Sequence, residues 1–154
     1  MAVIIAKDGR HITEDEALDY VLGYTCGNDI SARTAQFKTP SGALPKASLD
    51  GAAPLGPVIV SPVILKDGQG LRIQGIYNGR VVEDSNTSEM IFDVAKTIAH
   101  LSQGTTLEKG TVILTGTGPG IGFMRKPRIG LTHRAEMRVM IENIGTLINK
   151  VYHE

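Results

Sequence analysis

The sequence contains a single cysteine, Cys26, and no tryptophan. One cysteine cannot form a disulfide within the chain, which is typical of proteins in a reducing compartment. We expect Cys26 to be a small buried apolar residue, because free cysteines are most often found in protein cores. No cationic segment followed by a long apolar run opens the sequence, and its apolar runs are far too short to cross a membrane. These absences favour a soluble, cytoplasmic protein without a membrane partner.

An excess of charge of either sign is also missing. Lys and Arg total 16, Asp and Glu total 16, and the formal net charge is zero. Without a basic stripe there is no electrostatic footprint for nucleic acid, so we expect no nucleic-acid partner. The length of 154 residues suits a single domain, residues 1–154, and 42% of them are apolar, as in ordinary folded chains. The partner expected on these grounds is a small molecule or a second copy of the chain.

Alternating and β-branched apolar residues predict several short strands. Residues 2–6 form an apolar run typical of a buried strand. Residues 71–77 alternate between apolar and polar, and Asn78-Gly79 separates them from a second run at 80–82. Because both residues of Asn-Gly tolerate positive φ, this pair is the strongest short signal for a β-hairpin. Further strands are expected at 58–60, 111–114 and 137–148.

Two helices are expected among these strands. Thr13 and Glu16 have the spacing of a capping box, which predicts a helix over 13–22. Thr87 or Ser88 would cap a second helix. Its apolar face would consist of Met90, Ile91, Val94, Ile98 and Leu101. The predicted fold class is therefore α+β and mainly β, with two short helices.

The segment 28–36 gathers side chains that can do chemistry. Asp29 can hold a hard cation, Arg33 can grip a carboxylate with two hydrogen bonds, and Gln36 follows one helical turn later. A structural ion pair with a capped turn explains the same residues without any ligand. Lys46 lies in an irregular stretch, 38–57, that reads as a long functional loop. That lysine could stabilise an oxyanion or simply be a solvated loop residue.

The glycine-rich run 115–122 is the other candidate for ligand binding. It lacks the Gly-Lys-Ser/Thr ending of a phosphate-binding loop, so a nucleotide site is not expected. Its backbone amides, together with the Thr117 hydroxyl, could still bind a carboxylate or an oxyanion. The four histidines show no metal-ligand spacing, and no nucleophile elbow is present.

Five ordered blocks of sequence resemble the fumarylacetoacetate hydrolase (FAH) family over nearly the whole chain. The blocks are 23–33 (Gly-Tyr-Thr-Cys-Gly-Asn-Asp-Ile-Ser-Ala-Arg), 54–57 (Pro-Leu-Gly-Pro), 86–92 (Asn-Thr-Ser-Glu-Met-Ile-Phe), 115–122 (Thr-Gly-Thr-Gly-Pro-Gly-Ile-Gly) and 144–147 (Ile-Gly-Thr-Leu). The resemblance implies the mixed β-sandwich roll of that family's catalytic domain and a homodimer. It also implies an enzyme that isomerises, decarboxylates or hydrolyses enolisable oxo acids or β-dicarbonyls with Mg²⁺ or Mn²⁺.

The resemblance also implies roles for individual residues. Asp29 matches a metal ligand, while Arg33 and Gln36 match residues that bind substrate and organise a water. Thr117 matches a threonine that binds the substrate carboxylate, and Gly116 and Gly118 flank it. The family's Glu-x-Glu metal pair would stand immediately before the first strand, and the sequence begins just after that place. We therefore expect Mg²⁺ or Mn²⁺ to bind weakly or not at all.

A second departure from the family pattern concerns the loop lysine. The family's lysine stands three residues before the aspartate that Asp50 matches, but Ala47 occupies that place and Lys46 stands one residue earlier.

Two functional hypotheses follow. The first is an isomerase, tautomerase or cyclase, or a C–C hydrolase or decarboxylase, with a reduced metal site. The second is a non-catalytic relative that binds a ligand or serves as a dimerisation partner.

Overall fold

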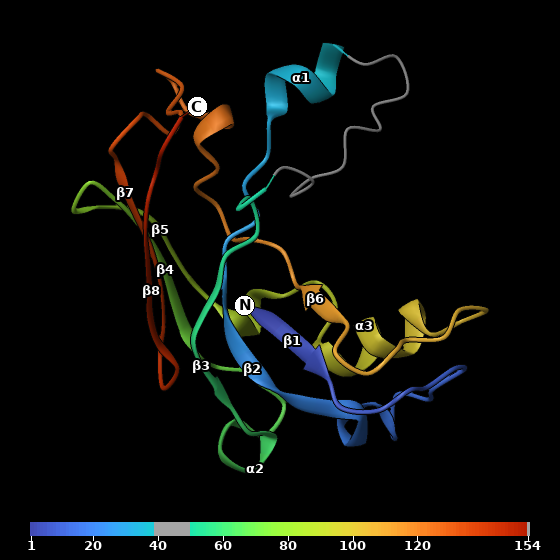
Figure 1. The fold of residues 1–154 in the computed structure, drawn as a ribbon. Helices are drawn as coiled ribbons and strands as arrows, with labels where there is room; N and C mark the ends of the chain where they lie inside the picture. The colour runs from blue at the N-terminus through green and yellow to red at the C-terminus, as the bar shows by residue number, and fades with distance from the viewer. Residues whose placement is uncertain (39–49, 154) are drawn as a thin grey trace.

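The computed structural model describes residues 1–38 and 50–153, which form two four-stranded antiparallel sheets (Figure 1). The first sheet has the order β3-β2-β1-β6, from β1 (Ala2–Ile5), β2 (Val21–Gly27), β3 (Leu55–Val60) and β6 (Val112–Leu114). The second has the order β5-β4-β7-β8, from β4 (Arg72–Tyr77), β5 (Arg80–Asn86), β7 (Glu136–Ile141) and β8 (Gly145–Lys150). The expectation of a mainly β fold with short helices is confirmed.

One hydrophobic core joins the two sheets. Val3 and Ile5 of β1 are buried in the same cluster as Val139 and Ile141 of β7. The helix α3 (Val94–Leu101) adds Ile98, whose side chain is fully buried. Cys26 is buried, as expected, and its burial raises the pKa of the thiol, which keeps it protonated and unreactive. Among the described residues, no helix is long and apolar enough to cross a membrane.

The hairpin of β4 and β5 forms as the sequence predicts. Asn78 and Gly79 at its turn both have positive φ, 47° and 78°. The register pairs Gly75 with Glu83 and Gln74 with Asp84. Because successive side chains of a strand point to opposite faces, Glu83 and Asp84 lie on opposite faces of the sheet.

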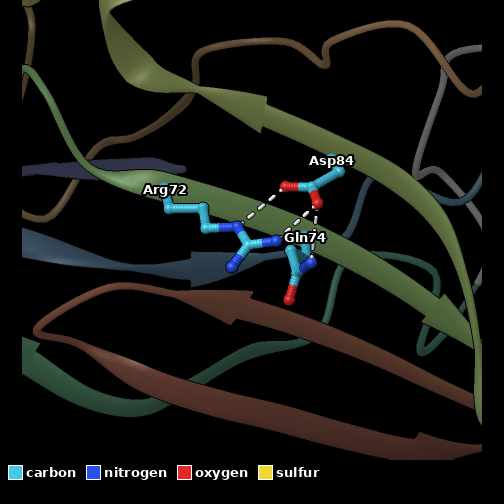
Figure 2. Close-up of polar contacts among 3 residues, drawn as sticks. All are labelled: Arg72, Gln74 and Asp84. Atoms are coloured by element: carbon cyan, nitrogen blue, oxygen red, sulfur yellow. Dashed lines mark hydrogen bonds and ion pairs between the residues drawn. The ribbon is translucent and has the colours of Figure 1, made fainter.

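Asp84 lies on the outer face of the hairpin, in a polar network. The Arg72 guanidinium donates to the Asp84 carboxylate at 2.9 Å and 2.6 Å, and the Gln74 amide donates to it at 3.0 Å (Figure 2). The hydrogen bond from Arg72 lowers the pKa of the Asp84 carboxyl. This network is exposed to solvent, so its ion pair contributes little to stability.

The prediction of a helix over 13–22 is wrong. Only the short 3₁₀ helix η1 (Ala17–Tyr20) forms, and β2 begins at Val21. The Thr13 hydroxyl donates to the Glu16 carboxylate at 2.9 Å, so the two side chains meet without capping an α-helix. From Val21 onward the chain forms strand β2, which pairs with both β1 and β3. Tertiary pairing thus overrides the local helical signal.

The second helix exists, but its expected start is wrong. Thr87–Glu89 form the 3₁₀ helix η2, and α3 is capped by Asp93, whose carboxylate accepts from the Lys96 amide at 2.8 Å. Val94 and Ile98 are buried as expected, whereas the Ile91 side chain, which precedes the helix, is 90% exposed. Two further short helices, α1 (Arg33–Lys38) and α2 (Pro62–Leu65), and the 3₁₀ helix η3 (Gly122–Met124) complete the described elements.

Candidate functional site

A cavity of about 820 Å³ lies between the segment that leaves β2, the glycine-rich run and the inner face of the second sheet. Its floor is formed by β4, β5 and β7 and includes Ile73, Gly75, Val139 and Glu83, which lie on the face opposite to Asp84. Its volume suits a small organic molecule. The helix α1 stands at one end of the sheets, beside the segment that contains η3 (Figure 1).

The glycine-rich run packs directly on strand β5. A Cβ placed on Gly118 would come within 2.5 Å of the Ser85 hydroxyl oxygen, and one on Gly120 within 2.4 Å of the Val82 carbonyl oxygen. Gly120 also has a φ of 147°, which residues with side chains rarely adopt. Because glycine has no side chain, the backbone of the run can lie directly against strand β5 at these positions.

The Glu83 carboxylate fastens the glycine-rich run to the sheet. It accepts a hydrogen bond from the Thr117 hydroxyl at 2.7 Å and one from the Gly118 amide at 2.9 Å. On the neighbouring strand, Gly75 leaves room for this side chain, since a Cβ there would stand 3.2 Å from Glu83 Cβ. Arg125 adds a second attachment, because its guanidinium donates to the Gly120 and Val82 carbonyl oxygens.

Arg33 and Gln36 are brought together by the first turn of α1. The Arg33 guanidinium donates to the Gln36 side-chain oxygen at 3.1 Å, and this bond uses one of its five N–H donors. Arg33 lines the cavity, and its guanidinium is partly exposed there. Within the part of the chain that the structure describes, Asp29 and Arg33 form no ion pair with each other. A structural ion pair between these two residues is therefore not formed.

The cavity collects most, but not all, of the residues named from the sequence. Asp29, Arg33, Gly116 and Thr117 line it. Gln36 and Gly118 are not among the described residues that line it; Gln36 accepts a hydrogen bond from Arg33, and Gly118 donates its amide to Glu83. Lys46 lies outside the described residues, so its place in the site stays a prediction.

Sequence reasoning missed Glu83, which lines the cavity with its carboxylate, and Arg125, which holds the glycine-rich run. A signal for Glu83 was present, because the period-two alternation of the hairpin puts it on the same face as the apolar Ile73. Its contacts with Thr117 and Gly118 distinguish it from an ordinary polar residue of a strand.

The described residues provide an incomplete donor set for a divalent metal. Residues 1–38 and 50–153 contain no group of three or more His, Cys, Asp or Glu side chains placed to hold an ion. Asp29 is exposed and available, whereas the Glu83 carboxylate is occupied by Thr117 and Gly118. Stable binding of Mg²⁺ would require further oxygen ligands from the substrate, from water or from other residues.

Residues 1–152 match the model of the fumarylacetoacetate (FAA) hydrolase C-terminal domain. The chain belongs to the fumarylacetoacetate hydrolase family. It is 40% identical, over 151 residues, to the mitochondrial oxaloacetate tautomerase Fahd2a of Rattus norvegicus. That match covers 98% of this chain and 48% of the relative, so the chain spans about half the length of this curated relative.

Two solved structures of enzymes have the same fold. A 5-carboxymethyl-2-hydroxymuconate delta-isomerase from Mycobacterium smegmatis superposes with a TM-score of 0.87 at 33% identity, covering 99% of this chain and 57% of that one. A fumarylpyruvate hydrolase from Pseudomonas aeruginosa, in complex with Mn²⁺ and pyruvate, gives a TM-score of 0.86 at 25% identity, covering 99% and 64%. The architecture implied by the sequence resemblance is therefore confirmed.

Proposed function

We propose that this FAH-family chain catalyses keto–enol tautomerisation of a small 2-oxo acid. The observation that carries the proposal is the cavity itself, which combines a partly exposed guanidinium, Arg33, with the carboxylates of Asp29 and Glu83. A cation can bind the carboxylate of an oxo acid, and a carboxylate can exchange protons with its enol. The rat relative is named an oxaloacetate tautomerase, which supports this reaction among those of the family.

Tautomerisation requires fewer catalytic functions from the site than C–C hydrolysis does. In converting an enol to its ketone, one proton leaves the enol oxygen and one is added to the adjacent carbon, while the double bond shifts from carbon–carbon to carbon–oxygen. Hydrolysis must in addition generate and aim a nucleophilic water. The residues that line the cavity include donors, acceptors and a cation that suit the first task.

Each residue has a separate part in this proposal. Arg33 binds the substrate carboxylate, and Gln36 is a positioning residue that holds the guanidinium through its 3.1 Å hydrogen bond. Asp29 borders the reacting atoms and serves as a proton acceptor or metal ligand. Lys46, which lies outside the described residues, would stabilise the enolate oxygen.

A divalent cation is the proposed cofactor. The Pseudomonas aeruginosa relative was solved with Mn²⁺ and pyruvate, and Asp29 is the carboxylate of this chain that fits such an ion. When bound, the ion would polarise the carbonyl oxygen of the substrate as a Lewis acid. Since the described donor set is incomplete, we propose that the 2-oxo acid supplies oxygen ligands of its own.

A homodimer is the proposed assembly. Strand β3 lies at the edge of its sheet, and it and α2 carry apolar side chains that face solvent in the single chain. Val63 and Ile64 of α2 are 90% and 69% exposed, and Leu55, Val58 and Ile59 of β3 are also exposed. A contiguous apolar edge of this kind is typical of a surface that pairs.

The compartment proposed from the sequence is the cytoplasm, although the rat relative is named as mitochondrial.

Proton exchange tests the proposal. Pyruvate or oxaloacetate is incubated with the protein and Mg²⁺ or Mn²⁺ in deuterated buffer, and proton NMR follows deuterium entering the carbon next to the oxo group. We expect exchange well above the buffer rate, reduced in Arg33→Ala and partly retained in Arg33→Lys, which keeps the charge but loses the planar fork. Exchange at the buffer rate by the folded protein would favour the non-catalytic alternative.

A further inference from the structure

The Glu83 carboxylate occupies the donors that the sequence assigns to a ligand. Family resemblance gives Thr117 the role of binding the substrate carboxylate, with the glycine-rich backbone beside it. In the structure the Thr117 hydroxyl donates to one Glu83 oxygen at 2.7 Å and the Gly118 amide donates to the other at 2.9 Å. The Glu83 carboxylate thus accepts the two hydrogen bonds that a ligand carboxylate would be expected to accept.

The two donors have no second hydrogen to offer. A backbone amide carries one hydrogen, and so does a hydroxyl. The Thr117 hydroxyl also lies 3.2 Å from the Gly118 carbonyl oxygen, so its hydrogen is already shared within the protein. A ligand carboxylate at this place would therefore meet another carboxylate and no available donor from this pair.

The glycine-rich run cannot easily move aside to relieve this conflict. Gly118 and Gly120 lie against Ser85 and Val82 at distances that leave no room for a Cβ. Arg125 fixes the run further by donating to the Gly120 carbonyl oxygen at 3.1 Å and to the carbonyl of Val82. A ligand must then either displace the Glu83 side chain or present a different group to it.

We propose that Glu83 is a specificity-determining residue, which makes this end of the cavity select a neutral hydrogen-bond donor, such as a hydroxyl or an amide, over a carboxylate. A donor group can bond to the remaining lone pairs of Glu83, whereas a carboxylate is repelled by its charge. The ligand carboxylate goes instead to Arg33, whose guanidinium has five N–H donors, of which the Gln36 bond uses one. The inference rests on the proposed function in taking an oxo acid as the ligand.

Oxalate and oxamate form a matched pair of probes, because oxamate replaces one carboxylate by a neutral amide of similar size. Each is titrated into the full chain in the presence of EDTA, so that oxalate cannot act by chelating a metal. The backbone ¹⁵N–¹H signal of Gly118 reports binding at this end, and NMR detects affinities into the millimolar range. The variants are Glu83→Gln, which removes the charge but keeps an acceptor, and Asp84→Asn, which removes the neighbouring charge on the outer face.

The wild type should bind oxamate about tenfold more tightly than oxalate, as expected for repulsion of two charges a few ångströms apart. Glu83→Gln should abolish this preference by tightening oxalate binding, and Asp84→Asn should leave it unchanged. An equal preference in the wild type and in Glu83→Gln would overturn the inference, as would a Gly118 signal that neither probe shifts. Deuterium exchange tests the proposed function independently, so normal exchange with unchanged selectivity would reject only the role of Glu83.

Discussion

The ring of Phe37 in α1 stacks on the ring of Phe123 in η3, with 5.4 Å between the centroids and 23° between the planes. The Arg128 guanidinium covers Phe123 at 4.1 Å from its centroid. The helix that carries Arg33 is thus attached to the segment that leaves the glycine-rich run. This contact joins the two halves of the candidate site, which lie far apart in sequence.

Loss of this stack should loosen substrate binding more than it slows turnover. Phe123→Ala removes an aromatic pair of the order of 1 kcal/mol and frees α1. We expect the KM for a 2-oxo acid to rise about tenfold while kcat falls less, since the groups around the reaction remain. Phe123→Tyr keeps the stack and should behave like the wild type. Steady-state kinetics decides the matter, and equal KM values in all three proteins would refute the positioning role.

Two glycines of the same run should tolerate alanine very differently. Gly116 and Gly120 both have positive φ, 95° and 147°, but a Cβ on Gly116 would meet nothing within 4 Å. A Cβ on Gly120 would meet the Val82 carbonyl at 2.4 Å. Gly116→Ala should cost about 1 kcal/mol of unfolding free energy from its backbone conformation, and Gly120→Ala about 3 kcal/mol or more. Urea denaturation measures both, and similar losses would argue against the close packing on β5.

Stability should fall at high pH because of Tyr24. This residue is fully buried, and its hydroxyl donates to the Lys66 carbonyl oxygen at 2.8 Å. Burial, with the charge of Asp67 adding to it, raises the pKa of Tyr24 to about 12. An unfolded tyrosine titrates near pH 10, so the folded state holds the proton more tightly between about pH 10 and 12. The contribution is complete below pH 10 and is lost as the pH rises through 12.

The size of this effect is of the order of 1–2 kcal/mol, because Lys66, which supplies the acceptor oxygen, is exposed and the hydrogen bond is therefore part-buried. Urea unfolding of the wild type and of Tyr24→Phe, repeated from pH 9 to 12, checks it. The variant should lose this part of the decline while keeping the part that other residues cause. Parallel curves for the two proteins would show that Tyr24 does not titrate as described.

The apolar edge formed by β3 and α2 predicts an assembly that one charge can break. Val63→Asp places a carboxylate on the 90% exposed side chain of α2. Light scattering after gel filtration should give twice the chain mass of 16.5 kDa for the wild type and the single mass for the variant. Val81→Asp, on an exposed position of β5, is the matched control and should remain dimeric. A monomeric wild type would contradict the proposed homodimer.

The parts of the fold that sequence could predict are those encoded by neighbouring residues. Asn78 and Gly79 determine their hairpin locally, since their positive φ values are a property of the two residues themselves. The segment 13–22 shows the opposite case. Its capping pattern is helical, but Val21 pairs with Ile5 of β1, a contact that no local pattern reveals.

Residue chemistry indicated the candidate segments separately, but only the resemblance joined them into one site. Asp29, Arg33 and Thr117 come together in one cavity, yet they are separated by up to 88 positions in the chain, from 29 to 117. Strand alternation places Glu83 on the same face as Ile73, but its importance could not be predicted, because it depends on contacts with Thr117 and Gly118 across two elements. Long-range pairing of this kind is fixed by the packing of the glycine-rich run on β5.

The decay of enol-oxaloacetate absorbance after mixing with the protein tests the central claim most directly. The account predicts that the wild type accelerates ketonisation far above the buffer rate and that Arg33→Ala lowers kcat/KM about a hundredfold, the loss expected for a charge-assisted carboxylate contact. A folded wild-type protein that leaves the decay at the buffer rate, with and without Mg²⁺ or Mn²⁺, would contradict it.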